Sequence, residues 1–388
     1  MFAAIGLARK LRLMALAVVS LVTLAACDAV TSGVSLNTRN AVPVALLVPQ
    51  SAPDGGAALA ASFENAARLA IADLGEGVEI DLRVYDTGGT SSSAATVAGQ
   101  AVSDGAKIIL GPVFGDAAAA AGATVAPRGV TVLSFSNNPA IAGGNVYILG
   151  STFQNTANRL VRHAALQGRR DIVIAHADSP AEAAGRDAIS RAIAANGLRL
   201  AGTSSFALNQ QAVIEAVPRI SEQVSTSGAT AVFMTSGNDG AVPFLAELLP
   251  ENGVDPAEIQ FIGLQRLDIP SGALALDGLQ GAWFAVPDPG LAAQFNARYQ
   301  AAFGAVPHPL AGLAYDGIAA IGALASTGGT QPFSQAAITR PSGFAGVNGV
   351  FRFLPNGTNE RALAVAQVQD RQVTYIDPAP RSFGAPGL

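Results

Sequence analysis

Short loops of this chain gather neutral hydrogen-bonding side chains next to glycines and an aromatic ring. Ser134, Ser136 and the two asparagines that follow supply hydroxyl and amide groups within one short segment. Such groups orient a small molecule by hydrogen bonds, while a ring such as Phe114 adds apolar contact area. The alternative is that Ser, Asn and Asp at these places only cap the helices that follow them. The chemistry indicated is reversible binding in a cleft. The predicted cleft residues are Gln50, Ser51, Val113, Phe114, Gly115, Asp116, Ser134, Ser136, Asn137, Asn138, Asp178, Ser236, Asn238 and Gln265.

The sequence lacks the residue patterns that usually indicate catalysis or metal binding. It contains no Gly-x-Ser-x-Gly turn, no phosphate loop ending in Gly-Lys-Ser/Thr, and no Ser-x-x-Lys with its partner motifs. The three histidines are scattered, and His163 and His176 have no acidic or cysteine neighbour at the spacing of metal ligands. We therefore predict that the protein is not an enzyme and has no catalytic residues, no metal and no cofactor.

Alternating strand and helix patterns must position these loops. In the first part of the chain, strands are predicted at 42–48, 80–84, 107–110 and 131–133, with helices at 58–74 and 92–103. After Gly150, strands are predicted at 172–175, 198–206, 231–235, 260–262, 283–286, 350–353, 364–368 and 373–376, and helices at 154–167, 181–195, 211–225, 240–249, 290–303 and 309–325. This alternation predicts an α/β protein with two doubly wound parallel-sheet lobes. In such sheets ligands bind beyond the carboxyl ends of the strands, which selects the loops named above.

The first 40 residues carry signals of a different kind. Basic residues between 9 and 12 precede an apolar run at 13–24, and small residues then lead to Cys27, the only cysteine. This layout is typical of a secretory signal peptide over residues 1–26, and Leu24-Ala25-Ala26-Cys27 resembles the lipobox of bacterial lipoproteins. Acyl chains on Cys27 would anchor the protein to a membrane, with the polar residues 27–40 as a tether. The alternatives are a buried cysteine or an uncleaved membrane helix, for which an apolar run of about 14 residues is short.

Composition and charge narrow the classes of partner. Half of the residues are hydrophobic and 13% are charged, which is enough apolar material for large cores. The net charge is −5 and lysine occurs only at Lys10 and Lys107, so we expect no nucleic-acid partner. Asp28, which follows the predicted lipid site, resembles the inner-membrane retention signal of enterobacterial lipoproteins. We therefore expect the periplasmic face of a bacterial membrane, the inner one being favoured and the outer one left open.

Several segments resemble the type-I periplasmic binding proteins of the Leu/Ile/Val-binding superfamily. The resemblance rests on Val-Pro-Val-Ala-Leu-Leu-Val-Pro at 42–49, Ile-Ile-Leu-Gly-Pro-Val at 108–113 and Val-Leu-Ser-Phe-Ser-Asn at 132–137. Ala-Tyr-Asp-Gly at 314–317 and Gly-Val-Phe-Arg-Phe at 349–353 are similar to that family's C-terminal signature. Leu-Ser-Phe-Ser-Asn at 133–137, followed by Val-Tyr-Ile-Leu-Gly at 146–150, looks closest to a lipoprotein subgroup, the penicillin-binding protein activators.

The resemblance implies two lobes joined by three crossovers, near residues 150, 287 and 351, with hinge closure over a ligand. The expected division assigns 41–149 and 288–350 to lobe 1. It assigns 150–287 and 351–388 to lobe 2.

The resemblance also implies which ligand groups the cleft meets. Transport members commonly hold the ligand carboxylate with a serine after the third strand, where this chain has Gly115 and Asp116. They often place an acid of the second lobe on the ligand ammonium, where this chain offers Gln265, and Asp54-Gly55 replaces their aromatic after the first strand. A buried ammonium without a carboxylate is unfavourable, and Asp116 would repel a ligand carboxylate. We therefore expect a neutral ligand, or no tight binding, in place of a zwitterionic amino acid.

Two functions of different classes follow from this resemblance. The first is a lipid-anchored penicillin-binding protein activator that regulates peptidoglycan synthesis by binding a penicillin-binding protein. The alternative is a solute-binding lipoprotein that delivers an amino acid, or another small polar ligand, to the permease of an ABC transporter. In both, the expected membrane contact is through the acyl chains of Cys27.

Overall fold

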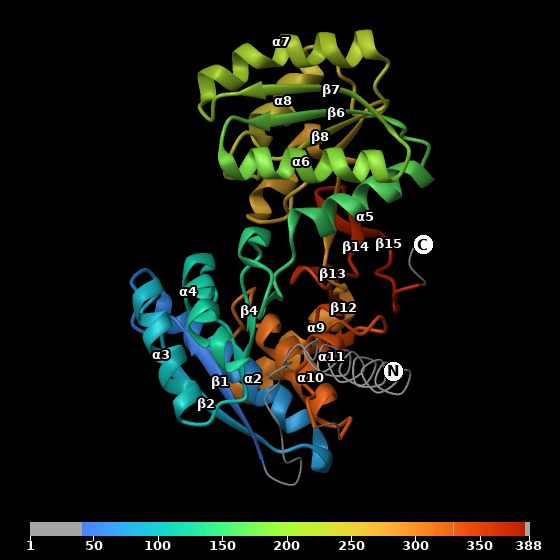
Figure 1. Ribbon diagram of the computed structural model, residues 1–388. Helices are drawn as coiled ribbons and strands as arrows, with labels where there is room; N and C mark the ends of the chain where they lie inside the picture. Colours follow the sequence, from blue (N-terminus) through green and yellow to red (C-terminus); the bar gives the residue numbers. More distant parts are fainter. Residues whose placement is uncertain (1–40, 329, 385–388) are drawn as a thin grey trace, which may run out of the picture.

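The computed structural model describes residues 41–328 and 330–384 of the chain. They form two lobes, one above the other in Figure 1, and the chain passes between the lobes three times. The predicted signal peptide, tether and lipid site at Cys27 lie outside the described residues. None of the described helices is both long enough and apolar enough to cross a membrane.

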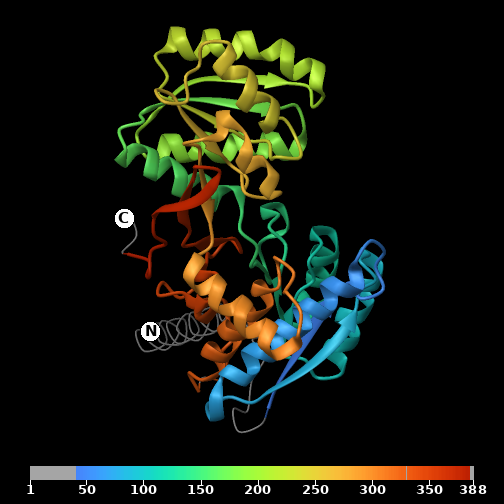
Figure 2. The ribbon, with the colours of Figure 1, turned by 180° about the vertical axis from the view of Figure 1, so that it is seen from behind.

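The lower lobe is built on a parallel sheet with the strand order β2-β1-β3-β4-β5. Its strands are β1 (Val42–Val48), β2 (Ile80–Asp86), β3 (Ile108–Leu110), β4 (Thr131–Ser134) and β5 (Val146–Ile148). Helices α2 (Gly56–Asp73), α9 (Pro289–Phe303) and α10 (Gly312–Ala325) cover one face, and α3 (Ser91–Ser103) and α4 (Gly115–Val125) cover the other. β1 is apolar because both of its faces are buried, with Leu46 in one core and Leu47 in the other. Figure 2 shows α9 and α10 (orange) lying against α2 (blue).

The upper lobe is built on a larger sheet with the order β15-β14-β10-β9-β8-β6-β7. Its parallel strands are β6 (Asp171–Ala177), β7 (Arg199–Phe206), β8 (Ala231–Met234), β9 (Gln260–Gly263) and β10 (Trp283–Val286), and the antiparallel strands β14 (Ala364–Gln369) and β15 (Gln372–Asp377) extend them. Helices α5 (Phe153–Leu166) and α6 (Pro180–Ala195) pack on one face, and α7 (Gln210–Ser227) and α8 (Val242–Glu251) pack on the other. The predicted α/β class, with parallel sheets covered on both faces, is confirmed.

A third, small antiparallel sheet lies next to the passages between the lobes. It consists of β11 (Phe344–Gly346), β12 (Gly349–Phe353) and β13 (Asn359–Arg361), and the short helix α11 (Gln335–Ile338) precedes it. Phe344, Phe351 and Phe353 are buried in the core of the lower lobe. The third passage between the lobes therefore runs from β13 to β14, and the predicted boundary at 350/351 falls inside β12. The other two passages run from β5 to α5 and from β10 to α9.

Several short elements differ from the sequence-based expectations. The sequence patterns predict no helix at 115–125, whereas this segment forms α4, so that Gly115 and Asp116 occupy the first turn of a helix. Strands β5, β11 and β13 have three residues each, too few to show a period of two. Short 3₁₀ helices complete the connections: η1 (Gly75–Gly77), η2 (Ala126–Arg128), η3 (Pro139–Ile141), η4 (Ser271–Ala275) and η5 (Asp277–Leu279).

A buried ion pair joins α10 to the third passage. Asp316 Oδ2 lies 2.9 Å from Arg361 Nη1, and the two side chains are 0% and 3% exposed. Arg361 Nε donates to the carbonyl oxygen of Leu149 at 2.7 Å, in the first passage. Asp316 also accepts from the backbone of Val347 at 2.8 Å and from the amide of Asn348 at 3.1 Å. The pair thus holds the β11–β12 turn and two of the passages in one place.

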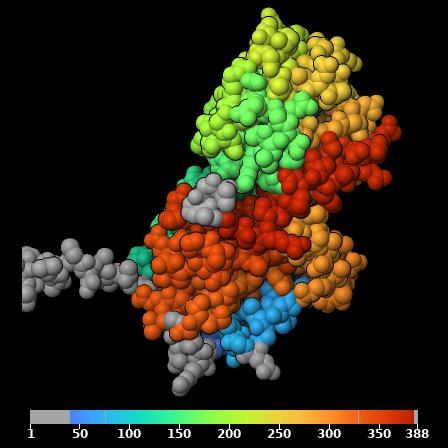
Figure 3. Space-filling view, turned by 90° about the vertical axis from the view of Figure 1, so that its right-hand side faces the viewer, coloured from blue at the N-terminus to red at the C-terminus, as the bar shows by residue number. Residues whose placement is uncertain are grey.

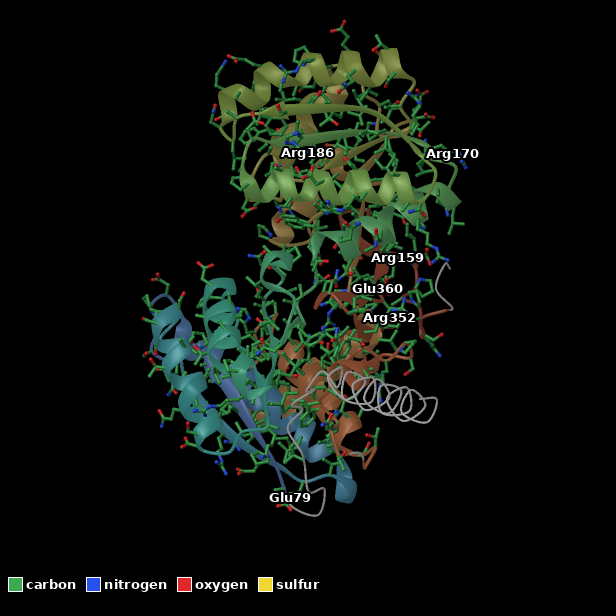
Figure 4. The ribbon with its side chains drawn as sticks, viewed as in Figure 1. Glu79, Arg159, Arg170, Arg186, Arg352 and Glu360 are labelled. Carbon is green, nitrogen blue, oxygen red and sulfur yellow. The ribbon has the colours of Figure 1, made fainter. Side chains whose placement is uncertain are left out.

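A second polar cluster fixes the end of β15 to α5. Arg159 donates from Nε to the carbonyl oxygen of Leu363 at 2.6 Å and lies 2.9 Å from the carboxylate of Asp377. His163 Nδ1 lies 2.8 Å from the other oxygen of that carboxylate. Burial pushes the pKa of Asp377 upward, but the hydrogen bonds from Arg159 and His163 outweigh burial and hold the pKa below its usual value. Figure 4 shows Arg159, Arg352 and Glu360 along the region that connects the two lobes.

We expect Asp316→Asn to lower the free energy of unfolding by about 3 kcal/mol, because it leaves the Arg361 guanidinium buried without a counter-charge. Urea unfolding followed by circular dichroism measures the effect. The control is Glu64→Gln, which removes a salt bridge whose side chains are 53% and 34% exposed and should cost at most about 1 kcal/mol. Equal losses in the two variants would show that the buried pair has no special weight.

Candidate functional site

A cavity of about 600 Å³ opens at the carboxyl edge of the lower sheet, where β2, β3 and β4 give way to the segments that follow them. Its lining residues are Gly89, Thr90, Ser91, Val113, Phe114, Gly115, Asp116, Ala117, Ser136, Asn137 and Asn138. Seven of the predicted cleft residues are in this set, since Val113–Asp116 contribute four and Ser136–Asn138 contribute three. The parallel sheet brings these two segments together because β3 and β4 are neighbours and end at the same edge.

The first turns of two helices face this cavity. Thr90 is the N-cap of α3, and its side chain accepts a hydrogen bond from Ser93 N at 3.3 Å. Phe114 is the N-cap residue of α4 and offers no side-chain cap, and the residue is 46% exposed. The first amides of each helix lack intrahelical acceptors, and the helix dipole makes this end positive. The cavity therefore presents backbone donors to a ligand.

Asp116 supplies a charge of the opposite sign. It is the only charged side chain among the described residues that line the cavity, and it sits in the first turn of α4. No lysine or arginine lines the cavity to hold an anionic group by a side-chain salt bridge. The arrangement suits a ligand with hydroxyl or amide groups better than one with a free carboxylate.

The loop after β4 is held by its own side chains. Ser134 is fully buried; its hydroxyl donates to the carbonyl oxygen of Pro112 at 2.8 Å and accepts from Ser136 N at 3.1 Å. Ser136 Oγ accepts from Asn138 N, and Asn138 caps η3 by accepting from Ala140 N. Ser134 therefore supports the loop without lining the cavity, and it caps no helix, whereas Asn138 caps η3 as the capping alternative describes. Three residues of this loop also line the cavity: Ser136, Asn137 and Asn138.

Gln50 and Ser51 follow β1 and are exposed, outside the set that lines the cavity. Ser51 N donates to Asp86 Oδ1 at 3.1 Å, and Gly88 N donates to the same oxygen at 2.8 Å. Asp86 thus joins the loop after β1 to the loop after β2, which carries the cavity residues Gly89 and Thr90. Burial pushes the pKa of Asp86 upward, but hydrogen bonds from Ser51 and from the backbone of Gly88 and Gln50 outweigh burial and hold the pKa below its usual value.

The predicted residues of the upper lobe fall into two groups. Ser236 and Asn238 follow β8, and Gln265 follows β9 and donates to the carbonyl oxygen of Thr235 at 3.1 Å. Ser236 Oγ and Asn238 Oδ1 are buried and have no hydrogen-bond partner among the described residues. Asp178, in contrast, is exposed and lines a different cavity of about 750 Å³ between β7 and α7. The structure therefore separates Asp178 from the other three.

The lower-lobe and upper-lobe residues do not share a cavity in this arrangement. The cavity at α3 and α4 is lined only by the lower lobe, and the cavity at β7 and α7 only by the upper lobe. A ligand held by both sets would require the lobes to move together. Among the described residues, no group of three or more His, Cys, Asp and Glu side chains is placed to hold a metal ion.

Comparison with known proteins agrees with this architecture. Residues 41–372 match the family model described as "Periplasmic binding protein". The chain belongs to the periplasmic binding protein family. This match confirms the predicted type-I superfamily, and it spans both lobes of this binding protein. No curated protein matches its sequence.

Solved structures share the fold at low identity. A branched-chain amino acid ABC transporter periplasmic ligand-binding protein from Burkholderia xenovorans LB400 is 19% identical, with a TM-score of 0.67 over 87% of this chain and 96% of that one. An ABC transporter substrate-binding protein from Desulfitobacterium hafniense, in complex with Leu, is 18% identical, with a TM-score of 0.63 over 87% and 100%. A solute-binding protein of an ABC transporter from Rhodopseudomonas palustris BisB5, in complex with 3,4-dihydroxybenzoic acid, is 18% identical, with a TM-score of 0.60 over 89% and 99%.

Four residues that line the lower-lobe cavity of this binding protein are not predicted by the sequence: Gly89, Thr90, Ser91 and Ala117. Ala117 lies in the first turn of α4, and the other three lie in the segment that leads from β2 into α3. The rule that ligands bind beyond the carboxyl ends of parallel strands selects the loops after the first, third and fourth strands. It applies equally to the second strand, so it could have found Gly89, Thr90 and Ser91.

We expect Asp86→Asn to make the stability of the protein less sensitive to acid. The pKa of Asp86 is lowered in the folded state, so its contribution is present above the unfolded value near 3.8 and is lost as the pH falls through the folded value. Urea midpoints measured from neutral pH into the acid range should therefore fall less steeply for the variant than for the parent. Ser51→Ala, which removes the hydrogen bond from the Ser51 hydroxyl and keeps the one from its backbone, should give an intermediate slope. Identical slopes for all three proteins would contradict this role of Asp86.

Proposed function

We propose that this protein is the solute-binding component of an ABC transporter and that it binds a small polar molecule between its lobes. The observation that carries the proposal is the pairing of two half-sites without catalytic groups. The lower one presents two helix N-termini and the amides of Asn137 and Asn138, and the upper one contains Ser236 Oγ and Asn238 Oδ1, which are buried and have no partner among the described residues. The solved proteins that share this fold are described as ABC transporter binding proteins, two of them in complex with a small molecule.

The residues at the two half-sites favour a ligand without a free carboxylate. Asp116 lines the lower cavity, and its negative charge would repel a ligand carboxylate. Gln265 offers a neutral amide, so a buried ligand ammonium would lack the acid that it needs as a partner. A neutral molecule with several hydroxyl or amide donors meets both conditions. Phe114 adds an exposed ring against which an apolar part can pack.

The transport function is preferred to the penicillin-binding protein activator that the sequence first favoured. The activator hypothesis rests on the short phrases at 133–137 and 146–150. Those phrases occupy β4, β5 and the loops that follow them, where several of their side chains fill the core and Ser134 and Ser136 hold the loop. A surface that would recognise a penicillin-binding protein does not follow from them.

Ligand screening by thermal shift tests the transport proposal. We expect a neutral, hydroxyl-rich or amide-rich compound to raise the unfolding midpoint, since a ligand at 100 times its dissociation constant adds about 2.7 kcal/mol. Phe114→Ala and Asn137→Ala should each weaken that ligand about tenfold. Glu215→Gln, in the cavity between β7 and α7, is the control and should leave affinity unchanged.

Two results would contradict the proposal or its ligand class. Tight binding of leucine that survives Asp116→Asn unchanged would refute the argument about ligand charge. The second result has two parts: no compound of an amino-acid, sugar and metabolite library binds, and the protein stimulates a purified penicillin-binding protein. That result would refute the transport function and support the regulatory one.

We also propose that the protein is held at the periplasmic face of a membrane through acyl chains on Cys27. The support is the sequence signal alone, together with a family whose members are periplasmic binding proteins. Metabolic labelling with an alkyne-bearing fatty acid should label the parent and leave Cys27→Ser unlabelled, with equal protein on the immunoblot. An unlabelled parent, or label that persists in the variant, would remove the anchor from Cys27.

A further inference from the structure

The free edge of β15 differs from the other long sheet edges of the molecule. β2 carries Asp81 and Arg83 along the edge of the lower sheet. At the far edge of the upper sheet, Arg219 on α7 donates to the carbonyl oxygen of Ser205 on β7 at 2.6 Å. From Gln372 to Ile376, β15 has neither a charge nor a proline. Soluble proteins usually protect an edge strand by such features, so this edge is open to pairing with another strand.

The outward backbone groups of β15 can be identified from the ladder. Val368 N donates to Ala282 O at 3.0 Å, and Val368 O accepts from Gly281 N at 2.7 Å, so Val368 faces β10. Its partner across the β14–β15 pair is Val373. Because both groups of a residue point to the same side in an antiparallel ladder, Val373 and Tyr375 direct their N–H and C=O groups away from β14.

Side chains on this edge are exposed as well. Tyr375 is 55% exposed and Ile376 is 37% exposed. Figure 3 shows the C-terminal hairpin (red) on the surface of the upper lobe, where it projects from the body of the molecule. The register shift in β15 lies beyond Tyr375, and residues 372–375 pair regularly with β14.

We propose that β15 pairs with β15 of a second copy of this chain, antiparallel and about a two-fold axis at Thr374. In that register Val373 lies opposite Tyr375 of the second copy, and the outward backbone groups of both residues meet. The two Thr374 residues lie opposite each other as a pair that is not hydrogen-bonded through the backbone. Aromatic–β-branched and Thr–Thr pairs are both favourable across antiparallel strands.

The outward backbone groups also select this register. They belong to Val373 and Tyr375, and only an axis at Thr374 places each of them opposite the other residue of the second copy. A shift of one residue would place the outward groups of one strand against residues that face their own β14. The upper sheets of the two copies would then continue into each other through β15, with the lower lobes and their cavities left free. This dimer is independent of which ligand the protein binds.

Sedimentation velocity of the full chain in a mild detergent, over a concentration series, tests the dimer. The parent should associate reversibly, and Thr374→Lys and Thr374→Glu should each raise the dimer dissociation constant at least about tenfold, because like charges then lie opposite each other. An equimolar mixture of the two variants should recover the dimer. Thr203→Lys on β7 is the matched control, since Thr203 is exposed on the opposite edge, and it should associate like the parent.

The mixing experiment separates this interface from others and from misfolding. Circular dichroism should show both Thr374 variants folded, as expected for an exposed side chain. A parent that stays monomeric up to near-millimolar concentration would overturn the proposal. So would a dimer that persists in both charged variants, or one that the mixture fails to recover.

Discussion

The buried ion pair between Asp316 and Arg361 is the constraint on which the two-lobe arrangement depends. Arg361 belongs to the third passage and bonds to Leu149 in the first, while Asp316 holds Asn348, whose carbonyl oxygen accepts from Asp288 N of the second at 3.4 Å. Gly346 is required beside the pair, because a Cβ there would come within 2.1 Å of Asp316 Oδ1. A buried charge is tolerated only when it is paired and hydrogen-bonded. The three passages therefore meet at one fixed polar joint, and rotation of the lobes has to be absorbed by residues flanking it.

This joint explains why the candidate site consists of two halves. Each half is fixed within its own lobe: Asp86 joins two loops of the lower lobe, and Gln265 holds the segment after β8 in the upper lobe. Ser136 and Asn138 hold the loop after β4 by hydrogen bonds and also line the cavity, so a role in supporting the loop does not exclude a place in the candidate site. Half-sites held in this way would lose little conformational entropy on binding a ligand between the lobes, as the proposed function requires.

The C-terminal segment connects the joint to the outer edge of the molecule. It leaves the lower lobe after β13, pairs with β10 as β14 and returns as the exposed strand β15. The end of β15 is fixed to α5 by Asp377, which contacts both Arg159 and His163. The free edge of the upper sheet is therefore held in a defined position relative to the passages, so two copies paired there would keep a fixed orientation of their upper lobes.

The sequence by itself determined the doubly wound architecture. In most elements the apolar residues repeat regularly over several positions, with a period of two in strands and 3.6 in helices. Val42–Val48 is apolar enough to predict a strand buried on both faces, and the loops at 113–116 and 136–138 follow from the carboxyl-edge rule. Only the tertiary structure decided that Ser134 is internal, that Asp178 lies at another cavity, and that Phe351 and Phe353 belong to the lower lobe. Local patterns report which face of an element is apolar, but not which of two cores covers it. That choice depends on contacts between residues far apart in the chain, such as Asp316 with Arg361, which no local spacing encodes.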